Sequence, residues 1–112
     1  MEIGISHHNS HEIATASSDV QLYKLTSGRK GYVRAITITN NAASTTKVSL
    51  WDAVSTSSGT AMYSYIVGSG TSIALDKNDL GDMEIYNGLV AQASVATSGG
   101  KVFVYVCVEE TP

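Results

Sequence analysis

The chain has 112 residues, enough for one domain, and its 7 Lys and Arg against 10 Asp and Glu give a formal net charge of −3. A domain that binds DNA or RNA needs a positive surface to displace counterions, so this balance argues against a nucleic-acid partner. We also expect no membrane span, no secretory signal and no multi-thiolate zinc site. No run of about 18 apolar residues occurs, Met1 is followed by no basic or long apolar segment, and Cys107 is the only cysteine.

Residues 1–19 are predicted to form an N-terminal arm, distinct from a domain at 20–112, because the hydrophobic residues of this segment are sparse (Ile3, Ile5 and Ile13). Two alternatives stay open for the arm: a strand added to the edge of a sheet, or an extension that reaches a neighbouring subunit.

The arm also holds the three histidines of the chain, His7, His8 and His11. Imidazoles at this density are candidate ligands of zinc or nickel, most readily where a trimer supplies one from each subunit. No carboxylate or thiol stands at a partner spacing, and His7 and His11 would share a face only on a helix. We therefore expect a solvated arm without metal, whose imidazoles titrate at roughly pH 6–7.

The rest of the chain is predicted to be all-β. Val and Ile number 19 against 6 Leu, and β-branched residues favour pleated strands. Strands are expected at residues 20–26, 32–39, 46–53, 61–67, 71–75, 82–86, 88–97 and 101–109, separated by Gly, Ser and Asn clusters. No helix is expected, so the strands pair antiparallel. Eight short strands predict an antiparallel β-sandwich that is jelly-roll-like, with another Greek-key order as the alternative.

Aromatic residues in two of these strands suggest a contact surface. Trp51 alternates with Leu50 and so faces away from the apolar side of its strand, whereas Tyr63 and Tyr65 share one face. Packing across strands or into a subunit interface is the favoured role. The alternative is an aromatic platform for sugars.

An acidic stretch at 76–84 has the oxygen-rich pattern of a calcium loop up to Gly81. Leu80 stands where an oxygen donor is needed, and Asn87 stands where the closing bidentate glutamate belongs. An Asp- and Asn-rich turn between two strands is the preferred interpretation, with a surface calcium site as the alternative.

Two glycine-containing turns and the last strand complete the predicted fold. Asn87-Gly88 predicts a type I′ hairpin, and 98–100 (Ser-Gly-Gly) predicts a tight connection between the last two strands. In the last strand, valines at 102, 104, 106 and 108 share one face, and Phe103, Tyr105 and Cys107 share the other. Such a two-sided strand is typical of the centre of a sheet.

Catalytic motifs are absent from the sequence. There is no Gly-x-Ser-x-Gly elbow, and no glycine-rich phosphate loop precedes a helix. Cys107 lies in the most apolar strand, where a thiol is inert. An acid pair would have to be assembled from Asp52 with Asp79 or Glu84, and no spacing supports it. We predict that the protein is not an enzyme and has no cofactor.

Four segments resemble a known class of proteins. The run from Gly31 to Asn41 (GYVRAITITNN) leads through a Ser- and Thr-rich turn into Lys47–Ala53 (KVSLWDA), followed by Ile73-Ala74-Leu75 and Gly88-Leu89-Val90-Ala91. This succession, from Val20 to Glu109, is similar to small β-sandwich proteins of tailed-phage and related virus particles. The resemblance implies a capsid decoration (cement) protein, or else a tail or spike component.

Members of that class assemble as trimers on the capsid surface and grip the shell with an N-terminal arm and sandwich edges. The resemblance therefore implies a homotrimer on the virion whose partner is the major capsid protein or another virion protein. The expected contacts are Ile3, Ile5, His7, His8, His11 and Ile13. A receptor- or carbohydrate-binding β-sandwich that uses aromatic residues such as Trp51 is the alternative function.

Overall fold

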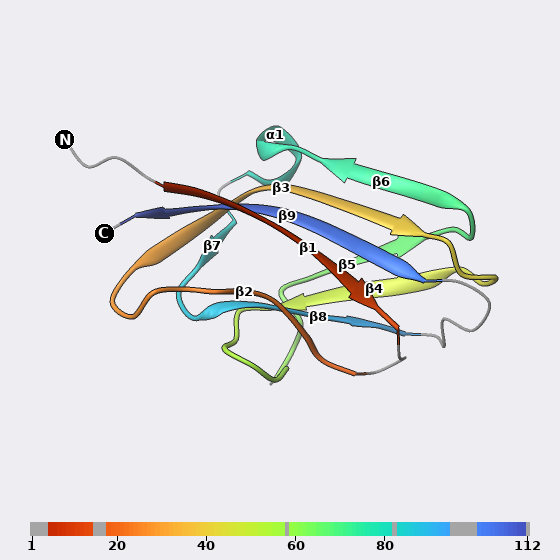
Figure 1. Cartoon of the computed structure of the whole chain (residues 1–112), viewed down its shortest axis with the longest axis horizontal. Coiled ribbons are helices and arrows are strands. Elements are labelled where there is room, and N and C mark those ends of the chain that lie inside the picture. Colours follow the sequence, from red (N-terminus) through yellow and green to blue (C-terminus); the bar gives the residue numbers. More distant parts are fainter. Residues whose placement is uncertain (1–4, 15–17, 58, 82, 95–100, 112) are drawn as a thin grey trace.

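Two antiparallel sheets pack face to face in the computed structural model, which describes residues 5–14, 18–57, 59–81, 83–94 and 101–111 (Figure 1). The first sheet has the order β1 (Ile5–Ile13), β9 (Val102–Thr111), β3 (Lys30–Asn40) and β6 (Thr71–Leu75), with the short β7 (Glu84–Ile85) also paired to β3. The second sheet has the order β2 (Val20–Lys24), β8 (Gly88–Ala93), β4 (Thr46–Trp51) and β5 (Tyr63–Val67). One helical turn, α1 (Lys77–Leu80), follows β6.

The strand pairs are nested along the chain, because β4 pairs with β5, β3 with β6, β2 with β8, and β1 with β9. The chain passes from one sheet to the other after β1, β2, β3, β5, β7 and β8. A long hairpin rolled up in this way is a jelly roll. The predicted all-β, jelly-roll-like sandwich is thus confirmed.

The number of strands in the roll is eight, as predicted, but one of the eight differs from the prediction. The eight strands of the roll include β1, which lies in the segment predicted as an arm. Among the described residues of the predicted strand at 82–86, only the two residues of β7 are extended in a sheet. Of the two alternatives left open for the arm, the structure has the strand added to an edge. Its partner is β9 of the same chain, with which it pairs from Ile5 to Ile13.

The core lies between the sheets and follows from the alternation of the strands. The inward side chains of β9 (Val102, Val104, Val106 and Val108) have no exposed surface. They pack with the inward residues of β3 and of the second sheet, among them Ile36, Ile38, Val48, Leu50 and Leu89. Since β9 lies between β1 and β3, the prediction of a central, two-sided last strand is confirmed.

The Asn87-Gly88 hairpin prediction is wrong. β7 belongs to the first sheet and β8 to the second, so this pair lies where the chain crosses between sheets. The Asp52 carboxylate accepts the backbone N–H groups of Tyr86, Asn87 and Gly88 at 3.0, 2.9 and 3.3 Å, which holds the crossing in place. Gly88 is needed for close approach, because a Cβ there would lie 2.6 Å from two backbone carbonyl oxygens. The connection predicted at 98–100 lies outside the described residues; β8 and β9 lie in different sheets.

The expectation of no helix is wrong at one place, the acidic stretch. The Asp76 carboxylate accepts the backbone N–H groups of Asn78 at 2.8 Å and Asp79 at 3.1 Å, and the Asp79 carboxylate accepts that of Asp76 at 3.0 Å. This capping box begins α1, and the backbone hydrogen bonds lower the pKa of Asp76. Leu80, which breaks the calcium-loop pattern, is buried against the core. The segment is therefore a capped turn whose first carboxylates are occupied by its own backbone.

No helix in the described part of the chain is long and apolar enough to cross a membrane.

Candidate functional site

The pairing of β1 with β9 separates the three histidines. His7 and His11 lie opposite Val108 and Val104, on the inner side of the sheet, and His8 lies opposite Cys107 on the outer side. His11 Nε2 donates to the carbonyl oxygen of Leu22 at 3.0 Å, which ties β1 to the second sheet. Among the described residues no three His, Cys, Asp or Glu side chains are grouped so that they could hold a metal.

The isoleucines predicted as contacts are also separated. Ile13 has no exposed surface and belongs to the core, so its side chain is not available to a partner. Ile5 is 55% exposed at the start of β1. Ile3 lies outside the described residues. Of the predicted arm contacts, Ile5 and His8 are the exposed ones.

A buried carboxylate that the sequence reasoning missed lies beneath β1. Glu110 is 4% exposed, accepts hydrogen bonds from Tyr23 Oη and, at 2.7 Å, from the Thr26 backbone N–H, and lies 3.6 Å from His7 Nε2. Burial alone would raise the pKa of Glu110, but the bonds from Tyr23 and Thr26 and the nearby His7 outweigh it, so the pKa is lowered. The same burial and the carboxylate raise the pKa of Tyr23. The alternation of β9 was the available signal, since it places residue 110 on the valine side.

The outer surface of the first sheet is here called the β9 face. It carries Phe103, 40% exposed, and Tyr105 from β9, His8 and Ser10 from β1, and Thr37 and Thr39 from β3. His8 bonds through Nδ1 to Tyr105 Oη, with the two rings stacked at 5.9 Å. Cys107 lies beneath, its Sγ 3.9 Å from His8 Nε2, and burial raises the pKa of its thiol. The thiol is therefore kept protonated and unreactive.

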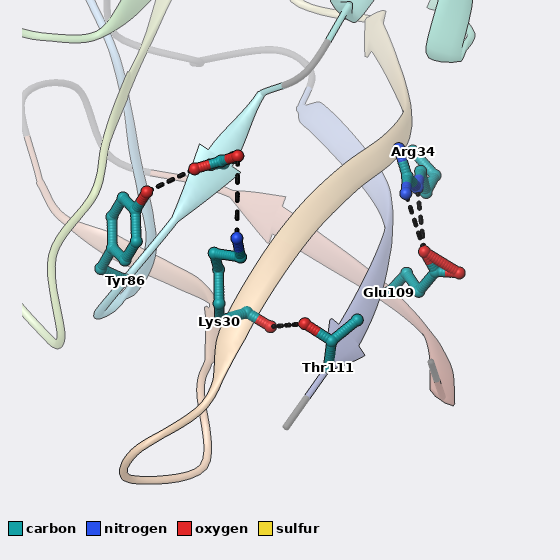
Figure 2. Close-up of polar contacts among 6 residues, drawn as sticks. Lys30, Arg34, Tyr86, Glu109 and Thr111 are labelled. Carbon is teal, nitrogen blue, oxygen red and sulfur yellow. Dashed lines mark hydrogen bonds and ion pairs between the residues drawn. The ribbon is translucent and has the colours of Figure 1, made fainter. Parts of the chain in front are cut away.

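Charged groups gather at the ends of this face and are paired with one another. Arg34 Nη2 donates to Glu109 Oε1 at 2.8 Å, and Lys101 lies 3.2 Å from Glu12. Figure 2 shows the end of the face near the start of β3. Lys30 and Tyr86 both lie near the Glu84 carboxylate of β7, and Arg34 pairs with Glu109. The middle of the β9 face is left with hydroxyl, aromatic and imidazole groups.

The three aromatic residues predicted as a contact set lie on opposite sides of the second sheet. Tyr63 and Tyr65 pair with Leu50 and Val48 on the inner side, at the edge strand β5, where their rings stack 6.4 Å apart. Tyr65 packs against the core, and this burial raises its pKa. Trp51 alternates with Leu50 and lies on the outer side, as predicted. The structure thus does not assemble Trp51, Tyr63 and Tyr65 into one platform.

Trp51 lies in a groove of about 450 Å³ on the outer side of the second sheet, here called the Trp51 groove. Its walls come from β4, β5, β8 and the end of the 52–62 connection: Lys47, Ser49, Trp51, Thr60, Ala61, Ser64, Gln92, Ala93 and Ser94. The groove combines one large aromatic ring with several hydroxyl groups, one amide and one ammonium group.

No family model matches the chain, and no curated protein matches its sequence. Solved structures are similar to this chain. A chain from the disulfide-linked pili that form Bacillus endospore appendages superposes with a TM-score of 0.59 at 9% identity, over 99% of this chain and 88% of that chain. The coat protein of Tobacco streak virus gives a TM-score of 0.49 at 10% identity, over 99% of this chain and 86% of that chain. At 9% identity, the comparison with the pilus chain establishes the fold alone.

Proposed function

We propose that this protein is a non-enzymatic structural protein of a virus particle, a capsid decoration (cement) protein that binds the shell as an oligomer and stabilises it. The observation that carries the proposal is the β9 face, on which Phe103 and Tyr105 stand among hydroxyl groups while the charges are paired at its ends. Removing such a surface from water costs little free energy because it carries few unpaired charges. Aromatic residues are also enriched at the centres of protein interfaces. The jelly-roll fold, shared with a pilus protein, is compatible with a building-block role.

The proposed contact is made by the arm, residues 1–19, of which Ile5–Ile13 forms β1 at the edge of the first sheet. His8 and Ser10 of β1 extend the surface of Phe103 and Tyr105, whereas the exposed Ile5 lies opposite Glu110, on the inner side at the start of the strand. In a homotrimer three such surfaces would bind together, so a modest affinity for the major capsid protein becomes strong by avidity, with no new contact.

A pair of matched substitutions tests this assignment. Phe103 and Ile66 are both exposed apolar residues, at 40% and 72%, but Ile66 lies on the other sheet. Phe103→Glu should lower the affinity for virus particles, measured by co-sedimentation, by about 30-fold or more, as for the loss of an interface hot spot. Ile66→Glu should leave it unchanged. If the two variants bind equally, the β9 face is not the contact.

The class of protein is tested separately from the surface. Light scattering coupled to size-exclusion chromatography should give a trimer, and mass spectrometry of purified virus particles should find many copies per particle. A strictly monomeric protein that is absent from particles would contradict the proposal.

A further inference from the structure

The Trp51 groove has the length and chemistry of a ligand site that the proposed function does not use. Lys47, Ser49 and Trp51 are alternate residues of β4 on its outer side, and all three line the groove. Trp51 comes four positions after Lys47, which corresponds to about 14 Å along the strand. The groove is thus an elongated track with an aromatic ring at one end and a cation at the other.

The aromatic end is held in place. Trp51 Nε1 donates to the Gly59 carbonyl oxygen at 3.2 Å, which ties the ring to the 52–62 connection. With its polar atom satisfied within the chain, the indole presents carbon surface to the groove. A flat apolar ring of this kind suits the C–H face of a pyranose, which is apolar on its face and polar around its rim.

The floor of the groove supplies hydrogen-bonding groups that are already oriented. Ser49 Oγ and Ser64 Oγ lie 2.9 Å apart, so one hydroxyl hydrogen joins them and the other is free to donate to a ligand. Gln92 Nε2 donates to Asp19 Oδ1 and, at 3.0 Å, to Ser57 Oγ. The bond from Gln92 is the main reason that the pKa of Asp19 is lowered, so the carboxylate stays charged and holds the amide. The Gln92 Oε1 then remains as an acceptor.

The far end of the groove carries an unpaired positive charge. Lys47 forms no ion pair with any described residue, in contrast to Lys30, Arg34 and Lys101 on the first sheet. The Lys47 ammonium group lies beside hydroxyl and amide groups, at the other end of the groove from the Trp51 ring. This arrangement is complementary to a short sugar chain that carries carboxylate groups.

We propose that the Trp51 groove binds an acidic oligosaccharide. One sugar ring stacks on Trp51, its neighbour bonds to the Ser49–Ser64 pair and to Gln92, and the carboxylate of a uronic or sialic residue reaches Lys47. The groove and the β9 face lie on opposite outer surfaces of the sandwich, so glycan binding and the proposed particle binding can succeed or fail independently.

The sequence provides a direct probe, because Trp51 is the only tryptophan. The labelled protein is first applied to an array of acidic and neutral bacterial and animal glycans. A galacturonate tetrasaccharide and its carboxyl-reduced neutral counterpart are then titrated against the wild-type protein. The acidic sugar should change the tryptophan fluorescence saturably and bind about fivefold more tightly than the neutral one, the difference expected for one exposed ion pair.

Three variants assign the effect to the groove. Trp51→Ala should weaken calorimetrically measured binding by about tenfold or more, the loss expected for a stacked aromatic contact. Lys47→Gln, at an exposed position, should reduce the affinity for the acidic sugar to that for the neutral one and leave the latter unchanged. Phe103→Ala, on the opposite sheet, should bind both sugars like the wild type.

Two results would overturn the proposal: no acidic glycan bound on the array, or sugar binding that both Trp51→Ala and Lys47→Gln leave intact. If Trp51→Ala does not fold, as judged by its circular dichroism, the Lys47→Gln titration decides alone. Loss of particle binding in Trp51→Ala with no sugar binding in the wild type would assign the groove to a protein partner and likewise refute the glycan proposal.

Discussion

Replacing Tyr23 by phenylalanine removes one hydrogen-bond donor from the buried carboxylate of Glu110 and should make the protein less stable and more sensitive to acid. The Tyr23 ring keeps its place beside His7, at 5.5 Å between centroids, so packing changes little. What is lost is a hydrogen bond to a charged group, which contributes about 1.5–3 kcal/mol. For a domain of this size about 2 kcal/mol lowers Tm by roughly 10 °C.

The pH dependence follows from the direction of the pKa shift of Glu110. Its pKa in the folded protein lies below the ordinary value of 4.5, so the stabilisation is complete above that pH and is lost as the pH falls through the folded pKa. In Tyr23→Phe the effect of burial is opposed by fewer hydrogen bonds, so the pKa of Glu110 rises. The variant therefore takes up its proton at a higher pH than the wild type. The difference in stability between the two proteins should be largest near pH 7 and narrow below about pH 4.5.

Thermal unfolding followed by circular dichroism between pH 3 and pH 7 measures both effects, and the chain contains a matched control. Tyr86 Oη also donates to a glutamate, Glu84, but Tyr86 is 61% exposed. Tyr86→Phe should leave Tm unchanged, because water replaces the lost partner. Equal Tm values for Tyr23→Phe and the wild type at pH 7, or a gap that does not narrow in acid, would refute the assignment of Glu110 as a buried, hydrogen-bonded carboxylate.

Of three further substitutions, one should raise the free energy of unfolding and two should lower it. Thr46→Val should stabilise the protein by about 1 kcal/mol in urea unfolding, because the Thr46 hydroxyl is buried without a partner among the described residues; a loss of stability would contradict this. Gly88→Ala should cost about 3 kcal/mol, since its Cβ would lie 2.6 Å from two backbone carbonyl oxygens, whereas Gly68→Ala, whose Cβ would lie in ordinary contact with Thr71 at 3.5 Å, should fold normally. Asn40→Ala should lose about 3 kcal/mol, because the fully buried amide makes three 2.9 Å hydrogen bonds to backbone groups; a variant within about 1 kcal/mol of the wild type would show that water replaces them.

Strand positions were predictable because alternation along one strand is a local property. The alternate valines of β9 and the alternation of apolar and hydroxyl residues in β3 indicate which side chains point inward, whichever strand lies beside them. Turn chemistry was less informative. Asn87-Gly88 is an ordinary hairpin sequence, yet Gly88 serves a close backbone approach that arises only when β2 and the end of β4 lie beside it.

The candidate sites divide in the same way. The outward position of Trp51 follows from its alternation with Leu50, but the groove around it requires Ser64 and Gln92, which come from other strands. The histidines appeared as one cluster in the sequence, and strand pairing assigned His8 to one surface and His7 and His11 to the other. Glu110 could have been recognised as inward-facing, but its partners Tyr23 and Thr26 are more than 80 residues away in the chain.

The sequence by itself determined that this protein is an all-β sandwich, which of its strands is central, and that Trp51 lies on the opposite side of its strand from Leu50. Only the tertiary structure decided which strands are neighbours, that Ile5–Ile13 is a member of the sheet, and which side chains share the β9 face and the Trp51 groove. The physical reason is the distance along the chain over which each feature is determined. The inward or outward direction of a side chain depends on its own strand, whereas the pairing of strands depends on burying the whole core at once.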